Sequence, residues 1–232
     1  MKPTRRLLVL AAAAFLTPIV IGWIALAYLI ANRDRPIAWE LPSRHPVGPT
    51  ERNLAKTLEA KPAPEFLLEG TDGRTHSLRS LKQPVLLYFI NKDCPCSIEA
   101  EPMFGRIDLA YRGKASVVGI LHGSLQDAKD WANANDTEHL VLADPSGATI
   151  RAYGVPRSVY TAVLKDGQIL KMYPGYSGDM LLEVTRLLAE LARTPWKRVD
   201  PAYAPKRMTS GCEFDFEASE AAKQQPKRPS AD

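Results

Sequence analysis

Three cysteines are the side chains with the clearest potential for chemistry. Cys94 and Cys96 lie on either side of Pro95, and Cys212 lies far away near the carboxyl end. So few cysteines cannot build the disulfide framework of a small secreted scaffold. Two neighbouring thiols are instead suited to thiol–disulfide exchange, in which a thiolate attacks a disulfide sulfur. They are also suited to binding a soft metal such as Cu(I).

The place of Cys94 in the chain favours a reactive thiolate. A continuous apolar run over 84–90 predicts a strand buried on both faces, and a helix is predicted from about Pro95 to Tyr111. A thiol at this junction meets the unpaired N–H groups of the helix start, which favour the charged form. Pro95 suits the first helical turn, where its missing N–H is not needed. We therefore predict that Cys94 is the nucleophile and that Cys96 is its partner.

The elements that must position these thiols form an α/β pattern over residues 62–195. Short strand patterns alternate with helical ones and end in a hairpin and an amphipathic helix, in the order βαβαβ followed by ββα. This order predicts a central mixed β-sheet flanked by helices. The predicted strands after the first turn are 84–90, 116–121, 140–142, 159–164 and 168–172, and the predicted helices are 95–111, 125–135 and 178–193. Glu99 and Glu101 are predicted to be solvated residues of the first helix.

Residues 7–31 form an uncharged apolar run that predicts a transmembrane helix, since about 20 residues span the hydrocarbon core. Lys2, Arg5 and Arg6 precede it, which places residues 1–6 in the cytoplasm and the rest outside. A cleaved signal peptide is the alternative, but its apolar region is about 7–15 residues long and is followed by a small-x-small site. The sequence therefore favours an uncleaved anchor.

Two further segments lack apolar periodicity. Residues 32–61 are predicted to be a linker, and residues 196–232 are predicted to be a disordered tail that contains Cys212. The formal net charge is only +4, with basic residues gathered near the two ends of the chain. This distribution is not the basic stripe of a nucleic-acid-binding protein, so we expect no nucleic-acid partner.

The segment from Phe89 to Pro102 carries a resemblance to a known group. A cysteine five residues after Phe89 and a proline eight residues after Cys94 resemble the active-site segment of the thioredoxin-like redoxins. These include the membrane-anchored cytochrome-maturation thioredoxins and the alkyl-hydroperoxide-reductase/thiol-specific-antioxidant proteins. The resemblance implies a thioredoxin-like fold, a single-pass inner-membrane protein with a periplasmic domain, and a protein thiol or disulfide as substrate. It also implies a membrane-embedded thiol reductant as partner and no cofactor.

The sequence departs from the pattern of these proteins at several positions. Ser97 replaces the second cysteine of the usual Cys-x-x-Cys motif, and we expect its hydroxyl to hydrogen-bond the Cys94 thiolate. A Cys94–Cys96 disulfide would close a smaller and more strained ring, which suits an isomerase or an oxidant better than a reductant. Pro156, two residues before Ser158, is a candidate for the cis-proline of the group, with an ordinary loop proline as the alternative.

The leading hypothesis is an exported thiol–disulfide oxidoreductase in which Cys94 attacks a substrate disulfide and Cys96, or Cys212, resolves the mixed disulfide. Peroxide reduction through a Cys94 sulfenic acid is an alternative, with Cys212 or Cys96 as the resolving thiol. Gly211-Cys212 resembles the late Gly-Cys of one redoxin branch, whereas Asn91 replaces the threonine or serine of the peroxidases. A second alternative is Cu(I) binding or delivery by Cys94, Cys96 and His122.

Overall fold

The computed structural model describes residues 22–23 and 45–216. The chain divides into two compact units, residues 1–39 and residues 40–232, and the second contains the folded domain. The predicted cytoplasmic segment 1–6 lies outside the described residues, as does the predicted anchor 7–31 apart from Gly22 and Trp23. No helix within the described residues is long and apolar enough to cross a membrane.

A seven-stranded mixed sheet forms the centre of the domain, with the strand order β2-β1-β5-β4-β3-β6-β7. Strands β3, β4 and β5 are parallel, while β1, β6 and β7 pair antiparallel with their neighbours. This arrangement confirms the predicted mixed sheet. The strands are β1 (Leu67–Gly70), β2 (Thr75–Ser77), β3 (Val85–Ile90), β4 (Ser116–Leu121), β5 (Leu140–Ala143), β6 (Thr161–Lys165) and β7 (Gln168–Tyr173).

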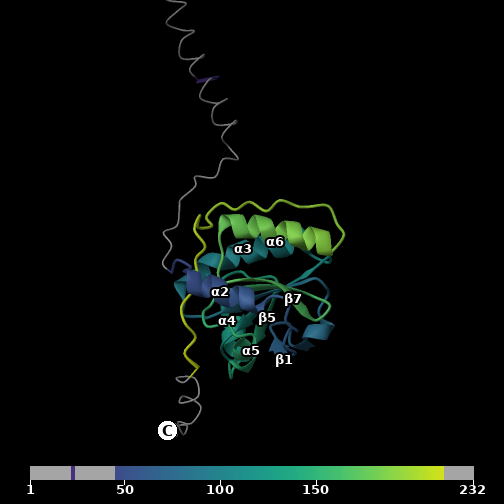
Figure 1. Cartoon of the computed structure of the whole chain (residues 1–232), viewed down its shortest axis with the longest axis vertical. Helices are drawn as coiled ribbons and strands as arrows, with labels where there is room; N and C mark the ends of the chain where they lie inside the picture. Colours follow the sequence, from purple (N-terminus) through teal and green to yellow (C-terminus); the bar gives the residue numbers. More distant parts are fainter. Residues whose placement is uncertain (1–21, 24–44, 217–232) are drawn as a thin grey trace, which may run out of the picture. The chain divides into compact units, whose positions relative to one another are not determined.

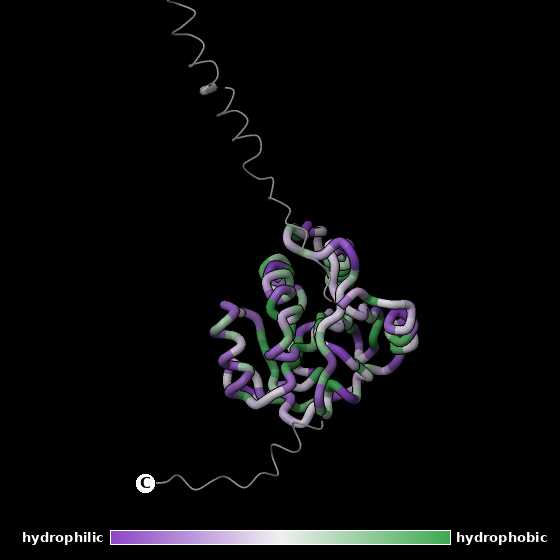
Figure 2. Tube along the Cα trace, turned by 90° about the vertical axis from the view of Figure 1, so that its left-hand side faces the viewer, coloured by the Kyte–Doolittle hydropathy of each residue, from purple (hydrophilic) through white to green (hydrophobic). Residues whose placement is uncertain are grey.

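Helices cover both faces of this sheet (Figure 1). Alternate residues of β3 point to opposite faces: Leu86 packs with residues of α3, α4 and α6, whereas Leu87 packs with residues of α2 and α5. Figure 2 shows hydrophobic residues concentrated in the strands between the helices. The helices are α2 (Pro49–Leu58), the 3-10 turn η1 (Leu78–Ser80), α3 (Pro95–Tyr111), α4 (Leu125–Ala134), α5 (Ala148–Ala152) and α6 (Gly178–Leu191).

Helix α3 is fixed to the sheet by a buried polar cluster that the sequence did not reveal. Glu101, predicted to be solvated, is 2% exposed. Its carboxylate accepts a hydrogen bond of 2.7 Å from the Tyr88 hydroxyl and one of 2.8 Å from the Thr137 hydroxyl. His139 Nε2 lies 2.7 Å from the same Tyr88 hydroxyl. A buried carboxylate requires such partners, so the cluster fixes the position of α3 relative to β3.

The predicted linker contains an element that was missed. Helix α2 lies within residues 32–61 and buries Ala55 against the sheet. Most of its other side chains are polar and solvent-facing, so only a few apolar residues mark its buried side. A proline in its first turn and Glu51, which accepts a hydrogen bond from the Gly48 amide, define its start.

The prediction of a disordered tail is wrong for residues 196–216. Thr209 exchanges two backbone hydrogen bonds of 2.9 Å with Tyr176. On its other side the tail meets the residues that precede α2, because Val47 N donates to Met208 O and Ser210 N donates to His45 O. Phe214 is buried in the core that α2 and α5 cover. Backbone hydrogen bonds and a few apolar side chains hold a segment whose average composition resembles disorder, and residues 217–232 lie outside the described part.

Gly175 gives a direct test of this packing. A Cβ atom at Gly175 would overlap the Thr209 carbonyl, so Gly175→Ala should push the tail away from Tyr176. We expect the Thr209 and Gly211 amides to exchange at least about tenfold faster with deuterium, because overpacking costs about 1–3 kcal/mol. Gly105→Ala is the matched control, since nothing lies within 4 Å of the added methyl group. Equal exchange in both variants would contradict the described tail packing.

Candidate active site

Cys94 occupies the junction between β3 and α3 that the sequence predicted. It is the N-cap residue of α3 with extended backbone angles, and Pro95 follows at the first helical position. Its carbonyl accepts a hydrogen bond of 3.0 Å from the Ser97 amide, within the first turn. Cys94 and Cys96 are both 0% exposed. Cys94 therefore sits at the positive end of a helix and is shielded from water.

All three cysteines are free, and the structure brings them together. The Cys212 amide donates a hydrogen bond of 3.0 Å to Cys94 Sγ. The neighbouring thiol of Cys96 contributes most to holding the pKa of Cys94 well below its usual range, with smaller contributions from Cys212 and Ser158, although burial acts in the opposite direction. Cys94 is thus the thiolate of the cluster.

The other two thiols keep their protons. The hydrogen bond to Cys94 raises the pKa of Cys96, and burial adds to the effect. Burial raises the pKa of Cys212 to about 11, with a further contribution from its hydrogen bond to Cys94. The thiolate is the nucleophilic form in disulfide exchange, and among the three cysteines the surroundings favour that form at Cys94.

A short segment of the tail covers Cys94 by pairing with the chain just before β6. Ser158 N donates to Cys212 O, and Gly211 N donates to Ser158 O, both at 2.9 Å. Next to them Arg157 and Glu213 form an antiparallel bridge, and the Arg157 guanidinium donates to the Glu213 carboxylate at 2.5 Å. Cys212 is therefore held against Cys94, although it lies far from it in sequence.

Asn91 contributes to the same contact, which the sequence did not suggest. Its side-chain amide donates a hydrogen bond of 3.1 Å to the Glu213 carbonyl. In the sequence this position stands out only because it lacks the hydroxyl group expected of a peroxidase. In this structure Asn91 connects the loop before Cys94 to the tail, so its role depends on a segment that was predicted to be disordered.

The structure does not bear out the supporting roles predicted for Pro156 and Ser97. The cis peptide bond within residues 22–23 and 45–216 is Gln83–Pro84, so Pro156 is not a cis-proline. The Pro156 carbonyl instead accepts a hydrogen bond of 3.2 Å from the Phe214 amide, and Ser158 is the residue that faces Cys94. The Ser97 hydroxyl is buried and makes no hydrogen bond, so it does not stabilise the Cys94 thiolate as predicted.

His122, the third ligand of the predicted copper site, belongs to an aromatic cluster. Its ring meets those of Phe214 and Phe216 edge-on, with centroids 6.0 Å and 5.2 Å apart. Among the described residues, no three His, Cys, Asp or Glu side chains come together as metal ligands. Cys94, Cys96 and His122 therefore do not form the three-ligand copper site considered from the sequence.

Comparison with known proteins relates this geometry to a family. The model of the AhpC/TSA family matches residues 60–172, the part of the chain that contains β1 to β6, all but the last residue of β7, and Cys94. Residues 60–172 are therefore similar to the AhpC/TSA proteins, in keeping with the resemblance of the active-site segment to the thioredoxin-like redoxins. No curated protein matches the chain, so the family similarity rests on the domain model, and the solved structures show the fold.

Three of the similar solved structures show the shared fold. A protein of Chlorobium tepidum assigned as the thiol:disulfide interchange protein DsbE is 22% identical with a TM-score of 0.53, covering 58% of this chain and 97% of that chain. Peroxidoxin BcpB of Mycobacterium tuberculosis is 21% identical with a TM-score of 0.50, covering 59% and 97%. The thioredoxin domain of a Bacteroides vulgatus thiol-disulfide oxidoreductase is 16% identical with a TM-score of 0.51, covering 56% and 97%. Together with the family model they support thiol redox chemistry in general.

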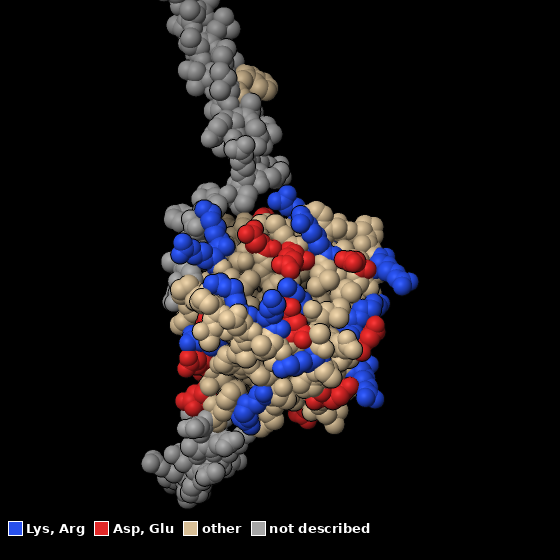
Figure 3. All heavy atoms as spheres, in the orientation of Figure 1, with Lys and Arg blue, Asp and Glu red and all other residues tan. Residues whose placement is uncertain are grey.

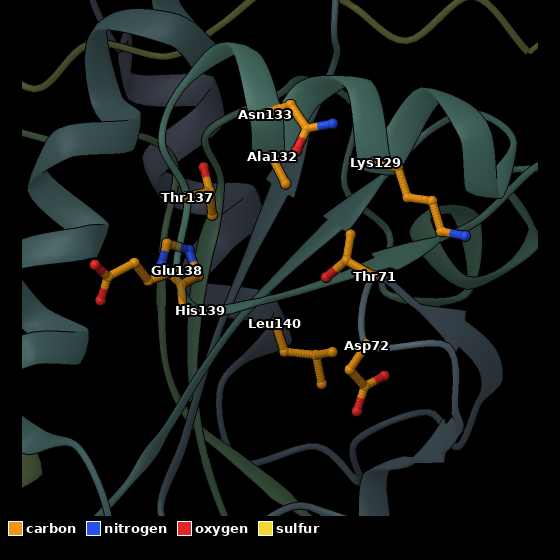
Figure 4. A pocket seen from close by; sticks show the side chains of 9 residues that line it. All are labelled: Thr71, Asp72, Lys129, Ala132, Asn133, Thr137, Glu138, His139 and Leu140. Carbon is orange, nitrogen blue, oxygen red and sulfur yellow. The ribbon is translucent and has the colours of Figure 1, made fainter.

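A pocket of about 620 Å³ lies elsewhere on the domain (Figure 4). Lys129 and Asn133 of α4 line it together with His139, which precedes β5. None of the three cysteines lines this pocket. This pocket is therefore separate from the buried cysteine cluster under the tail.

The ionisation of Cys94 can be measured from thiolate absorbance at 240 nm. We expect a midpoint well below the ordinary cysteine value of about 8.5, and Cys94→Ser should remove this low-pH transition. Cys96→Ala should raise the midpoint by about one to two pH units, because a hydrogen bond to a charged group contributes about 1.5–3 kcal/mol. Cys212→Ala is the comparison variant, with a smaller upward shift. An unchanged midpoint in Cys96→Ala would exclude Cys96 as the main donor.

Proposed function

We propose that this protein is a membrane-anchored, extracytoplasmic thiol–disulfide oxidoreductase in which Cys94 attacks a protein disulfide. The observation that carries the proposal is the buried Cys94 sulfur at the start of α3, which accepts a hydrogen bond from the Cys212 amide and lies in a cluster with Cys96 and Ser158 that lowers the pKa of its thiol. A thiolate stabilised in this way is ionised at neutral pH. Its attack on a disulfide therefore needs no separate base.

The exchange runs in two steps. The Cys94 thiolate attacks one sulfur of the substrate disulfide, which forms a mixed disulfide and expels the other substrate sulfur as a thiolate. A second thiol of the chain then loses its proton and attacks the Cys94 sulfur, which releases the remaining substrate thiolate and leaves an intramolecular disulfide. A membrane-embedded dithiol reductant would reverse this oxidation by the same exchange.

Cys212 is favoured over Cys96 as the second thiol. The pKa of Cys212 is raised less, to about 11, whereas that of Cys96 is raised further. Cys212 is also half-buried rather than fully buried. A bond between Cys94 and Cys96 would close a small ring across Pro95, with strained disulfide geometry.

Stabilisation of the Cys94 thiolate also affects whether the protein oxidises or reduces its substrates. Hydrogen bonds that favour the Cys94 thiolate stabilise the reduced protein relative to its disulfide form. A couple with a stabilised reduced form is more oxidising. We therefore infer that the protein acts as an isomerase or oxidant rather than as a strong reductant.

Peroxide reduction is the second candidate function. A low-pKa thiolate can attack a peroxide oxygen to give a sulfenic acid, which condenses with a neighbouring thiol to a disulfide and water. The contact between Cys212 and Cys94 favours this cycle. The amide of Asn91, which bonds the tail rather than offering a hydroxyl group, favours the exchange reaction instead.

The proposed location rests on the predicted anchor, and the proposed kind of partner rests on the charge distribution over the domain surface. Residues 7–31 would hold the protein in the inner membrane with residues 45–216 in the periplasm. Figure 3 shows basic and acidic side chains interspersed over the viewed face of the domain. Such a surface suits protein substrates and offers no basic stripe for nucleic acid.

Disulfide mapping and cysteine variants test the proposed chemistry. After one equivalent of oxidised glutathione, mass spectrometry of the full chain should find a Cys94–Cys212 bond. Cys94→Ser should lower the rate of exchange with a protein disulfide at least about a hundredfold, since it removes the attacking thiolate. Cys212→Ser should allow mixed disulfides to accumulate, whereas Cys96→Ser should not. Unchanged exchange in Cys94→Ser would reject the proposal, and faster turnover with peroxide than with disulfides would select the peroxidase function.

Membrane attachment is tested by fractionation of the full chain in a bacterial host. The protein should stay in the membrane fraction after extraction at alkaline pH, and an externally added protease should reach the domain only after the outer membrane is opened. Release of a shortened soluble domain would instead identify residues 7–31 as part of a cleaved signal.

A further inference from the structure

We propose that the edge formed by Arg157 and Ser158 binds an extended polypeptide that has glycine immediately before its reactive cysteine, and that residues 209–214 are a built-in occupant of this edge. The inference rests on the proposed function and specifies its substrate. The peptide would be held beside Cys94 in the place now taken by the tail.

Backbone pairing carries the first part of the proposal. The tail forms reciprocal hydrogen bonds with Ser158 on both sides of the Gly211–Cys212 peptide, and the bridge continues to Arg157 and Glu213. Main-chain hydrogen bonds of this kind accept any extended segment, because they do not depend on the side chains. When the tail is displaced, the backbone N–H and C=O groups of Ser158 are therefore available to pair with another extended polypeptide.

The requirement for glycine follows from the space at Gly211. A Cβ atom there would overlap the Ser158 hydroxyl oxygen and would lie only 2.9 Å from the Ser158 carbonyl oxygen. The backbone of Gly211 has no positive φ angle, so the restriction is steric rather than conformational. A peptide in the same register must have glycine at this position to bring its cysteine to Cys94.

An aromatic preference two residues after the cysteine follows from Phe214. Its side chain is 7% exposed and packs in the core beside α2 and α5. Its amide donates to the Pro156 carbonyl, and its ring meets that of His122 edge-on. The occupant thus has the form Gly-Cys-x-aromatic, in which the aromatic ring supplies apolar contact and the glycine permits close approach.

The occupied edge also explains how Cys94 is protected. With the tail in place Cys94 is fully buried, so a substrate must displace residues 209–214 before exchange begins. An intramolecular segment competes at a high effective concentration. External peptides that lack the matching glycine would not displace it.

The test uses the full chain with Cys212→Ala and a hexapeptide copy of residues 209–214, Thr-Ser-Gly-Cys-Glu-Phe. The peptide cysteine is joined to thionitrobenzoate, so attack by Cys94 forms the Cys94–peptide disulfide and releases the coloured thiolate. The matched peptide has alanine in place of the glycine. We expect the glycine peptide to react at least about tenfold faster, as overlap in a packed contact predicts. Equal rates for the two peptides would overturn the proposal.

Loosening the tail gives the second readout. Adding Gly211→Ala or Gly175→Ala to the same chain should speed the reaction with the glycine peptide severalfold, because each added methyl group clashes with a residue that holds or forms the tail. Gly105→Ala should leave the rate unchanged. No acceleration in either tail variant would show that the tail does not occupy the peptide site. Two tail variants at distant positions guard against a folding defect in one of them.

Failure of this inference can be distinguished from failure of the proposed function. The small disulfide 5,5′-dithiobis(2-nitrobenzoate) should react with Cys94 in both tail variants, and Cys94→Ser supplies the background from Cys96. Reaction with the small disulfide but no preference between the peptides would reject only the peptide site. An unreactive Cys94 in the loosened chains would reject the exchange function together with the inference built on it.

Discussion

The site depends on keeping one sulfur charged inside a nearly closed protein interior. Burial alone disfavours a thiolate, so the charge must be compensated by groups that are already in place. Here the start of α3 with Cys96, the amide and thiol of Cys212, and Ser158 all lie next to Cys94 Sγ. These groups come from three segments, which is why the loop before β6 and the tail must both reach the end of β3.

The fold is accordingly most tightly constrained at the end of the sheet that carries Cys94. β3 lies between a parallel and an antiparallel neighbour and is buried over its whole length. The Glu101 carboxylate holds α3 to the sheet through Tyr88 and Thr137. Glycines at 175 and 211 let two backbone segments approach more closely than any side chain would permit.

Local patterns were sufficient to predict much of this frame. The apolar run over 84–90 and the helix from Pro95 to Tyr111 match β3 and α3 because their periodicity reflects burial on known faces. The tail was missed for the opposite reason. Its order depends on hydrogen bonds to Tyr176 and Ser158, whose partners are distant in sequence and are made by backbone atoms. For the same reason the sequence suggested Pro156 and Ser97 as supporting residues, whereas Ser158 and Asn91 make the contacts.

The two ends of the described domain meet at one place. His45 and Val47 bond directly to Ser210 and Met208, a few residues before the cysteine that touches Cys94. Tension applied to the chain ahead of His45 would therefore load these few hydrogen bonds first, while the seven-stranded sheet behind them carried little of the force. The hydrogen bonds between residues 45–47 and 208–210 are therefore the part of the domain that would yield first under force. They belong to the same tail segment that covers the Cys94 sulfur.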